Sequence, residues 1–338
     1  MEMSREAMTT PVIEAIDLVK YFPIYGGFIG RKVEYLKAVD SVSLTIHQGE
    51  TLGLVGESGC GKTTVGYLIL NLLKLDRGNI LFKGVDVNTL RGHELQKIRK
   101  NLQVVFQDPQ SSLDPRMLIK KTVGYPLEVN GIAKGAEVVT RVKTILSEVG
   151  LDEDHMYRYP HEFSGGQRQR IGIARALITG PEFIVFDEPT SALDVSVQAQ
   201  ILNLITELQR RHGYSYLFIS HDLSVIKHVS HRIAVMYLGK IVETAPKAAL
   251  FKHPLHPYTR ALLTSVPKPD PGKRHSLEVL SGDVPSPVNV PSGCRFHPRC
   301  PEMTEVCRQD EPVTVEVETA HWVACHHPST NHPERSNR

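Results

Sequence analysis

The chain of 338 residues lacks any apolar run approaching the ~18 residues of a membrane-spanning helix, so we expect no segment to cross a membrane by itself. Residues 1–10 include acidic side chains and no apolar core, which argues against a secretory signal. The formal net charge is only +2, so bulk electrostatics give no case for a nucleic-acid partner. The composition is that of an ordinary globular protein, and the length allows two domains.

Cysteine is scarce and unevenly placed. Cys60 stands alone, whereas the other four cysteines fall close together near the end of the chain, separated by five, six and seventeen residues. The tight C-x₂₋₄-C pairs typical of structural zinc are therefore missing. Four thiols so close together in a chain without a secretory signal nevertheless favour a metal site over disulfides. The four residues are Cys294, Cys300, Cys307 and Cys325.

One glycine-rich stretch organises the rest of the chain. Residues 56–63 read G-E-S-G-C-G-K-T, between a predicted buried strand at 51–55 and a predicted helix at 64–74. This order is typical of a P-loop, whose backbone N–H groups bind phosphates together with the helix N-terminus. Lys62 is predicted to reach the β- and γ-phosphates of a nucleoside triphosphate, and Thr63 to ligate Mg²⁺. The predicted nucleotide-binding residues here are Gly56, Glu57, Ser58, Gly59, Cys60, Gly61, Lys62, Thr63 and Thr64.

Predicted strands and helices alternate along the chain. This alternation predicts a parallel α/β core, and the helical pattern from 111 to about 161 indicates a subdomain inserted into it. We expect a loop at 26–37 and a hairpin at 78–84. Strands are predicted at 12–20, 38–46, 102–106, 183–186 and 216–219, and helices at 138–149, 165–178 and 195–212.

Polar residues follow three of these strands. Asp187 and Glu188 come directly after an apolar run, and we predict that Asp187 joins the magnesium shell while Glu188 polarises the attacking water. His221 is placed to contact the γ-phosphate, although a lone histidine is more often structural. Gln107 ends a third strand, and its amide is predicted to bind the metal or the attacking water.

A second anion-binding helix N-terminus is predicted at Ser164, Gly165, Gly166 and Gln167, just before the helix at 165–178. One chain cannot fold both anion sites onto one phosphate. We therefore expect this site to face the nucleotide of a second subunit.

With these motifs in this order, about residues 12–265 resemble the nucleotide-binding subunit of an ABC transporter. The resemblance implies a P-loop NTPase core with an antiparallel β subdomain and an inserted helical subdomain at about 111–165. It also implies that Phe22 (or Tyr21) stacks on adenine, that Gln107 is the Q-loop, and that residues 164–167 are the signature. Residues 191–194, ending in Asp194, would be the D-loop, and His221 the switch histidine. The signature departs from the family pattern only at Phe163, where leucine is usual.

The C-terminal part resembles the oligopeptide/dipeptide branch of that family. The resemblance lies in residues 253–260 (H-P-L-H-P-Y-T-R), the proline-rich stretch at 267–291 and the four cysteines, together with 56–60 and 106–109. It implies an irregular extension at 266–338 whose cysteines hold a [4Fe-4S] cluster. Cluster ligands tolerate long loops, which favours the cluster over zinc and over free or disulfide-bonded thiols.

The resemblance implies a peripheral ATPase on the cytoplasmic side of the membrane that powers import of di- or oligopeptides. Its partners would be a second ATPase subunit (identical or a paralogue), two permeases and, through them, an extracytoplasmic peptide-binding protein. Nickel or oligosaccharide import is the alternative within the family. From other classes, a soluble ABC ATPase or a redox-sensing ATPase remains open. Residues 108–117 and 138–149 are predicted to offer the surface for the membrane partner.

Two expectations concern the surroundings of the cysteines. Arg295, Arg299, His297 and His326 could donate hydrogen bonds to a bound cluster, but solvated basic side chains are the expected state of each. The cysteines also lie more than 70 residues beyond His221. We therefore expect the cysteine site to be independent of ATP binding and to act in folding or docking.

Overall fold

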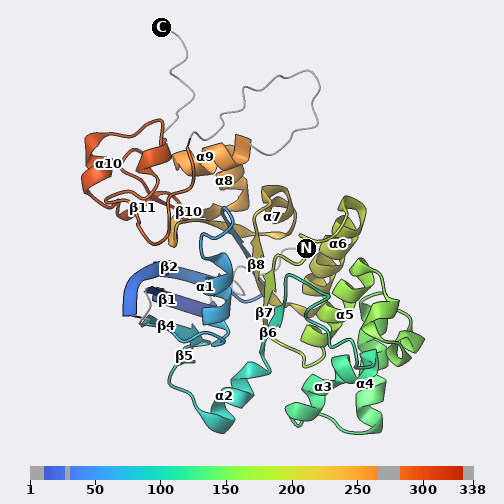
Figure 1. The fold of residues 1–338 in the computed structure, drawn as a ribbon. Coiled ribbons are helices and arrows are strands. Elements are labelled where there is room, and N and C mark those ends of the chain that lie inside the picture. The colour runs from blue at the N-terminus through green and yellow to red at the C-terminus, as the bar shows by residue number, and fades with distance from the viewer. Residues whose placement is uncertain (1–10, 27–30, 265–281, 330–338) are drawn as a thin grey trace, which may run out of the picture.

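The computed structural model describes residues 11–26, 31–264 and 282–329 (Figure 1). In this part of the chain, eight strands form one sheet in the order β11-β12-β10-β9-β3-β8-β7-β6. Four more form a second sheet in the order β2-β1-β4-β5. The predicted α/β core with an antiparallel β subdomain is confirmed.

The centre of the large sheet is parallel. Strands β6, β7, β8, β3 and β9 pair in parallel, and β7 and β8 are buried along their whole length. Because helices cover both faces of such a sheet, its strands are apolar without alternation. The bounds are β3 Thr51–Val55, β6 Leu102–Val105, β7 Phe183–Asp187, β8 Ser215–Ser220 and β9 Arg232–Tyr237.

The small sheet is antiparallel throughout and consists of β1 (Pro11–Gly26), β2 (Arg31–His47), β4 (Arg77–Phe82) and β5 (Val85–Asp86). The hairpin expected at 78–84 is confirmed. The loop predicted at 26–37 is wrong from Arg31 onward, since β2 pairs with β1 from that residue. Backbone hydrogen bonds form this end of the ribbon, and Glu34 and Tyr35 are exposed, so its side chains show no buried alternation.

Most predicted helices lie where the sequence places them, and the helix at 195–212 has the predicted bounds. The helix after the P-loop is shorter than expected, because Asn71 adopts a left-handed conformation with φ 52° soon after Ile69. The helices are α1 Lys62–Ile69, α2 Gly92–Arg99, α3 Ile119–Val129, α4 Ala136–Glu148, α5 Gly165–Leu177, α6 Val195–His212, α7 Leu223–Val229, α8 Lys247–Lys252, α9 Pro257–Thr264 and α10 Glu305–Gln309, with 3₁₀ turns at Glu153–Tyr157, Pro160–Glu162 and His297–Arg299.

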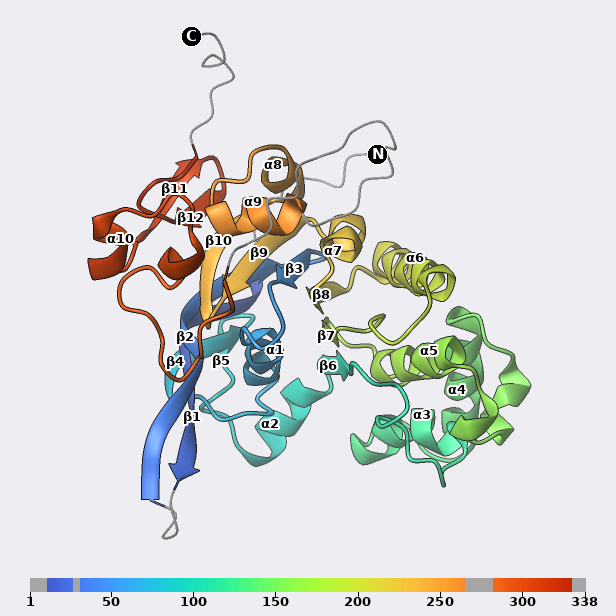
Figure 2. The ribbon, with the colours of Figure 1, turned by 45° about the horizontal axis from the view of Figure 1, so that its top comes forward.

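The helical subdomain follows β6. Helices α3 and α4 pack on each other and on α5 through buried apolar side chains such as Val123, Val142 and Leu146. In both views they lie on the side of the molecule opposite the C-terminal extension (Figure 1 and Figure 2). No helix in the described ranges is both long and apolar enough to cross a membrane.

The extension adds to the large sheet instead of forming an irregular tail. Strand β12 (His321–Ala324) pairs antiparallel with β10 (Lys240–Pro246) and with β11 (Thr314–Glu318). The buried carboxylate of Glu243 on β10 accepts hydrogen bonds from the backbone N–H groups of Leu255 and His256 and contacts His321 Nε2 at 2.7 Å. The expected boundary between 265 and 266 lies outside the described residues.

Candidate active site

The P-loop connects β3 to α1 as predicted. Gly61 has φ 108°, and a Cβ atom there would lie 2.0 Å from the carbonyl oxygen of Ala38, so only glycine fits. Lys62 is nearly buried, and its Nζ donates to the carbonyl oxygens of Gly56 and Glu57 at 2.8 and 2.9 Å. The loop thus keeps its cation close to the position where phosphates are expected.

Thr63 and Asp187 come together from α1 and β7. The Thr63 hydroxyl donates to Asp187 Oδ1 at 2.8 Å. Neighbouring ligands of an octahedral Mg²⁺ lie roughly 2.9 Å apart, so these two oxygens fit adjacent ligand positions. Burial raises the pKa of Asp187, although the hydroxyls of Thr63 and Tyr67 oppose the shift by hydrogen bonding to its carboxylate. Tyr67 was not predicted from the sequence, since nothing marks it there except its place one turn after Thr63.

Glu188 is the point where the other predicted catalytic residues meet. Its Oε2 accepts a hydrogen bond from the amide of Gln107 at 3.3 Å and lies 2.9 Å from His221 Nδ1. The backbone of Glu188 has φ 45°, a conformation that costs a non-glycine residue on the order of 1 kcal/mol or more. Such strain is concentrated at functional sites.

These residues line one open cavity of about 690 Å³. The P-loop contributes Glu57 and Ser58, and the remaining walls come from strand ends and from α9. Its lining residues are Glu57, Ser58, Gln107, Asp108, Glu188, Ser191, Ala192, His221 and Leu262. Residues 164–167, the predicted signature, are not among them, so the structure does not bring the signature to the P-loop of the same chain.

The signature residues build a helix N-terminus. The Ser164 hydroxyl accepts from the N–H of Gln167 at 3.3 Å, and the Gln167 amide oxygen accepts from the N–H of Ser164 at 3.0 Å. This capping box holds the start of α5 at the surface. A Cβ at Gly166 would lie 2.4 Å from a methyl group of Val197, so the glycine lets α5 pack closely on α6. Asp194 caps α6, and hydrogen bonds from the Val197 N–H and the Ser196 hydroxyl lower its pKa.

The two aromatic residues predicted to contact adenine lie on β1. The Tyr21 hydroxyl donates to Asp40 Oδ1 at 2.6 Å. Burial, reinforced by this carboxylate, raises the pKa of Tyr21 to about 12. Successive residues of a strand face opposite ways, so Phe22 presents its ring to the other side of β1. The ammonium group of Lys20 lies 5.5 Å from the ring centre of Phe22. Which of the two rings contacts adenine stays a prediction.

The four C-terminal cysteines converge. All four line one small pocket, together with histidines 256, 297, 326 and 327. They are free thiols, and burial raises the pKa of Cys294 and Cys300, and that of Cys325 to about 11. Within the described ranges, no three or more His, Cys, Asp or Glu side chains are arranged to hold a metal ion.

The expectation that Arg295 and Arg299 are solvated is wrong. Only 8% and 7% of these residues is exposed. Arg299 forms a bidentate ion pair with Glu57 of the P-loop, with N–O distances of 2.8 and 3.0 Å. Arg295 forms an ion pair with Asp40. This ion pair joins the extension to the P-loop across 242 residues of sequence. The expectation that the cysteine site is independent of ATP binding stays a prediction.

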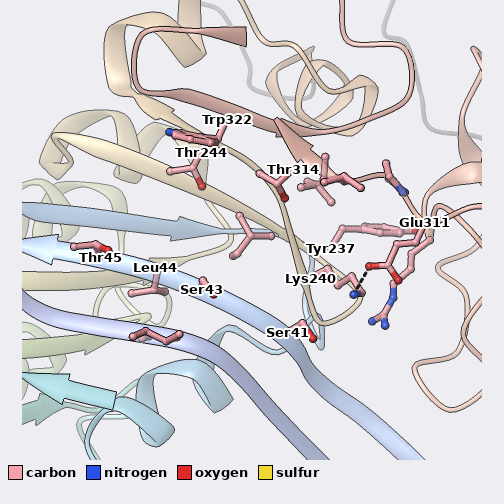
Figure 3. Close-up of a pocket in the computed structure, with 18 of the residues that line it drawn as sticks. Ser41, Ser43, Leu44, Thr45, Tyr237, Lys240, Thr244, Glu311, Thr314 and Trp322 are labelled. Carbon is pink, nitrogen blue, oxygen red and sulfur yellow. Dashed lines mark ion pairs between the residues drawn. The ribbon is translucent and has the colours of Figure 1, made fainter. Parts of the chain in front are cut away.

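A second cavity, of about 900 Å³, lies between β2, β10 and the extension (Figure 3). Ser43 and Thr45 face it from β2, Trp322 from β12, and the ion pair of Lys240 with Glu311 closes one end. None of the predicted catalytic residues lines it. It shares Cys294 and Phe296 with the thiol pocket.

Comparison with protein families gives two matches. Residues 39–191 match the model described as "ABC transporter", and residues 242–307 match that described as "Oligopeptide/dipeptide transporter, C-terminal region". Among curated proteins, the chain is 51% identical over 319 residues to "Oligopeptide transport ATP-binding protein AppF" of Bacillus subtilis, covering 93% of this chain and 97% of that protein. It is 47% identical to "Probable peptide ABC transporter ATP-binding protein y4tS" of Sinorhizobium fredii, covering 94% and 90%.

Solved structures show the same cassette. The chain is similar to the dimeric bacterial ABC transporter cassette MJ0796, with a TM-score of 0.61 and 30% identity over 70% of this chain and 98% of that one. It is also similar to cbiO1 of Clostridium perfringens, part of the ABC transporter complex cbiONQ, with a TM-score of 0.61 and 26% identity over 72% and 91%.

Proposed function

This chain belongs to the ATP-binding subunits of the oligopeptide ABC transporters, and on that premise we propose how its residues hydrolyse ATP to power peptide import. The observation that carries the proposal is the meeting of Gln107, Glu188 and His221 in the cavity that the P-loop lines. Their meeting beside the P-loop supports a joint role at an attacking water and a γ-phosphate.

We assign the binding of the triphosphate to the P-loop and to Lys62, whose Nζ exchanges the carbonyl oxygens of Gly56 and Glu57 for the β- and γ-phosphates. Thr63 and Asp187 would hold Mg²⁺, which neutralises charge on the phosphates. Magnesium takes most of its remaining ligands from phosphates and water, so two protein oxygens suffice.

Glu188 orients and polarises the attacking water, and Gln107 and His221 hold the Glu188 carboxylate in place. His221 also reaches the γ-phosphate as charge develops on it. Gln107 links the catalytic cavity to the helical subdomain, because it lies two residues after β6, in the chain segment that leads to α3.

Two chains would form the working ATPase. The N-terminus of α5 is capped, at the surface and outside the catalytic cavity, which supports its action on the nucleotide of a second cassette. The solved cassette MJ0796 is a dimer. We propose a head-to-tail pair in which Ser164, Gly165, Gly166 and Gln167 of each chain face the P-loop of the other.

The pair would act at the cytoplasmic face of the membrane, bound to two permease subunits and, through them, to an extracytoplasmic peptide-binding protein. The helical subdomain offers the surface for the permeases. Tyr125, Val129, Tyr157 and Tyr159 are large side chains at least 40% exposed on it. Exposed aromatic side chains on one subdomain are typical of an interaction surface. The relatives are named for peptides and oligopeptides, which favours peptides over nickel or oligosaccharides as the substrate.

For the extension we propose that Cys294, Cys300, Cys307 and Cys325 hold a [4Fe-4S] cluster. The four cysteines include no C-x₂₋₄-C pair, which weighs against zinc. In the described residues no group of three or more His, Cys, Asp or Glu side chains is arranged to hold a metal ion, which favours neither zinc nor the cluster. A cluster is held by four thiolates spread around a larger body, and four thiols lining one pocket suit it. Ligation would deprotonate all four thiols, including those of Cys294, Cys300 and Cys325, whose pKa values are raised by burial.

The decisive experiment is co-purification with candidate permeases, followed by measurement of ATP turnover in membranes with peptides, nickel and oligosaccharides supplied in turn. We expect binding to the permeases and stimulation by peptides. An ATPase that binds no membrane subunit and responds to no solute would contradict the proposal and favour a soluble or redox-sensing ATPase.

A further inference from the structure

The P-loop is held from outside by the C-terminal part of the chain. Glu57 is bound at two of its groups by residues that lie far away in the sequence. Its N–H donates to the hydroxyl of Tyr258 on α9 at 2.9 Å, and its carboxylate takes both terminal nitrogens of Arg299. Fork-to-fork pairs of this kind are the strongest and most directional ion pairs that arginine makes.

Arg299 itself is fixed in place. It is almost buried, its guanidinium lies 5.9 Å from the ring centre of Tyr237, and its hydrogen bonds to Glu57 raise its pKa further. Tyr237, Tyr258 and Phe296 pack on one another with ring centres 4.7 to 5.4 Å apart and are at most 1% exposed. The arginine is therefore presented to the P-loop by a rigid aromatic base.

The ion pair also has an electrostatic consequence for nucleotide binding. Glu57 lines the cavity in which we propose that the triphosphate binds, and its carboxylate is held by Arg299. An unpaired carboxylate there would repel the phosphates, whereas the adjacent guanidinium compensates its charge. The same arginine directly precedes Cys300, whose side chain lines the thiol pocket.

The extension reaches the nucleotide site at a second point. Arg295, which follows Cys294, donates to the carbonyl oxygen of Leu238 and forms an ion pair with Asp40, the residue that holds Tyr21 beside Phe22. The two arginines thus connect one short cysteine-bearing segment to the P-loop and to the strand that carries the adenine-stacking ring.

We propose that Arg299 is a positioning residue of the ATP site, through which the C-terminal extension fixes the P-loop and neutralises the charge of Glu57. The proposal rests on the function proposed above. Under this proposal the extension is part of the nucleotide site. Arg299, which would strengthen nucleotide binding, is adjacent in sequence to Cys300, which lines the thiol pocket.

The test is a double-mutant cycle on the full-length chain, read as equilibrium affinity for ATP and ADP. Arg299→Gln should weaken ATP binding at least ~10-fold, because one partner of an almost buried charge pair is removed. The affinity for ATP should fall more than the affinity for ADP, since ATP carries more negative charge. In a Glu57→Gln background, the same Arg299→Gln change should cost less than about twofold, because no carboxylate is left uncompensated.

Arg299→Lys keeps the positive charge but cannot form the bidentate pair, so it should recover part of the lost ATP affinity. If Arg299→Gln does not fold, the lysine variant takes its place in the test. The matched control is Arg260→Gln. Arg260 pairs with Glu302 of the extension and is not a lining residue of the catalytic cavity, so its loss should leave ATP affinity within about twofold.

Three results separate the ideas. A wild-type chain that binds no ATP would contradict the proposed function. If the wild type binds ATP and a folded Arg299→Gln variant binds it equally tightly, this inference alone is overturned. An Arg299→Gln loss of equal size with and without the Glu57 carboxylate would overturn it too, since a purely structural role predicts that equality.

Discussion

The two ends of the eight-stranded sheet are built on different principles. At the parallel end, catalytic groups lie at or directly after the ends of the strands that position them: Asp187 ends β7, Glu188 follows it, and His221 follows β8. At the antiparallel end, β12 pairs with β10 through the backbone, and buried contacts between distant parts of the chain, such as Glu243 with His321, add to that pairing. The parallel end brings the catalytic side chains close together, and the antiparallel end joins the extension to the ATP site.

The largest expected effect tests the parallel end. Glu188→Gln keeps the size of the side chain and removes the carboxylate that polarises water. ATP turnover should fall by ~10²-fold or more, in line with general-base contributions, while ATP still binds. Phosphate release and equilibrium binding measure the two quantities separately. Turnover near the wild-type rate would remove Glu188 from this role.

The next effect concerns the signature. Ser164→Arg places a bulky cation at the N-terminus of α5 and should leave ATP binding by the same chain intact. It should prevent ATP-dependent dimer closure, which sedimentation measures. Ser164→Ala is the control, because it loses the same capping hydroxyl, worth roughly 1 kcal/mol, without adding bulk or charge. Unchanged association of the arginine variant on ATP would contradict the sandwich.

These differences explain what the sequence could predict. Lys62, Thr63, Asp187 and Glu188 sit in short motifs beside their own strands, so local pattern was enough to locate them. The contact of Gln107 with Glu188 was not predicted, although it agrees with the rule that parallel strands end at one edge of a sheet.

The contacts of the extension could not be predicted in this way. Arg299 is followed by a cysteine and preceded by a proline, and nothing in that neighbourhood points to a P-loop 242 residues earlier. Its burial depends on the stacking of Tyr237, Tyr258 and Phe296, which come from three separate segments. The pairing of β12 with β10 likewise depends on tertiary packing, because β11 and β12 are short and half exposed.

A third experiment tests the content of the thiol pocket. Protein purified without oxygen should be brown and carry about four iron atoms per chain, and Cys300→Ser should remove the metal. ATP affinity should fall by less than in Arg299→Gln, since the ion pair with Glu57 remains possible. A colourless preparation with stoichiometric zinc would exclude the cluster.

The smallest effect on turnover is expected at the antiparallel end, from Glu243→Gln. The buried Glu243 carboxylate accepts two backbone N–H groups and contacts His321, so it holds both β12 and the start of α9 to β10. The glutamine amide has only one acceptor oxygen. Its NH₂ group would therefore face a backbone N–H that the second carboxylate oxygen now accepts, and that donor would lose its partner. Unpaired donors of this kind cost about 2 kcal/mol, and the loss should lower the melting temperature by several degrees.

Glu318→Gln is the matched control for Glu243→Gln. Glu318 faces the other ring nitrogen of His321 at 3.7 Å, but its side chain is half exposed, so its loss should be nearly neutral. Hydrogen exchange should show faster exchange in β11 and β12 for Glu243→Gln only, with ATP turnover within about threefold of the wild type because Glu243 does not line the catalytic cavity. Equal exchange in the two variants would mean that β12 is held by its backbone pairing with β10 and not by the buried carboxylate.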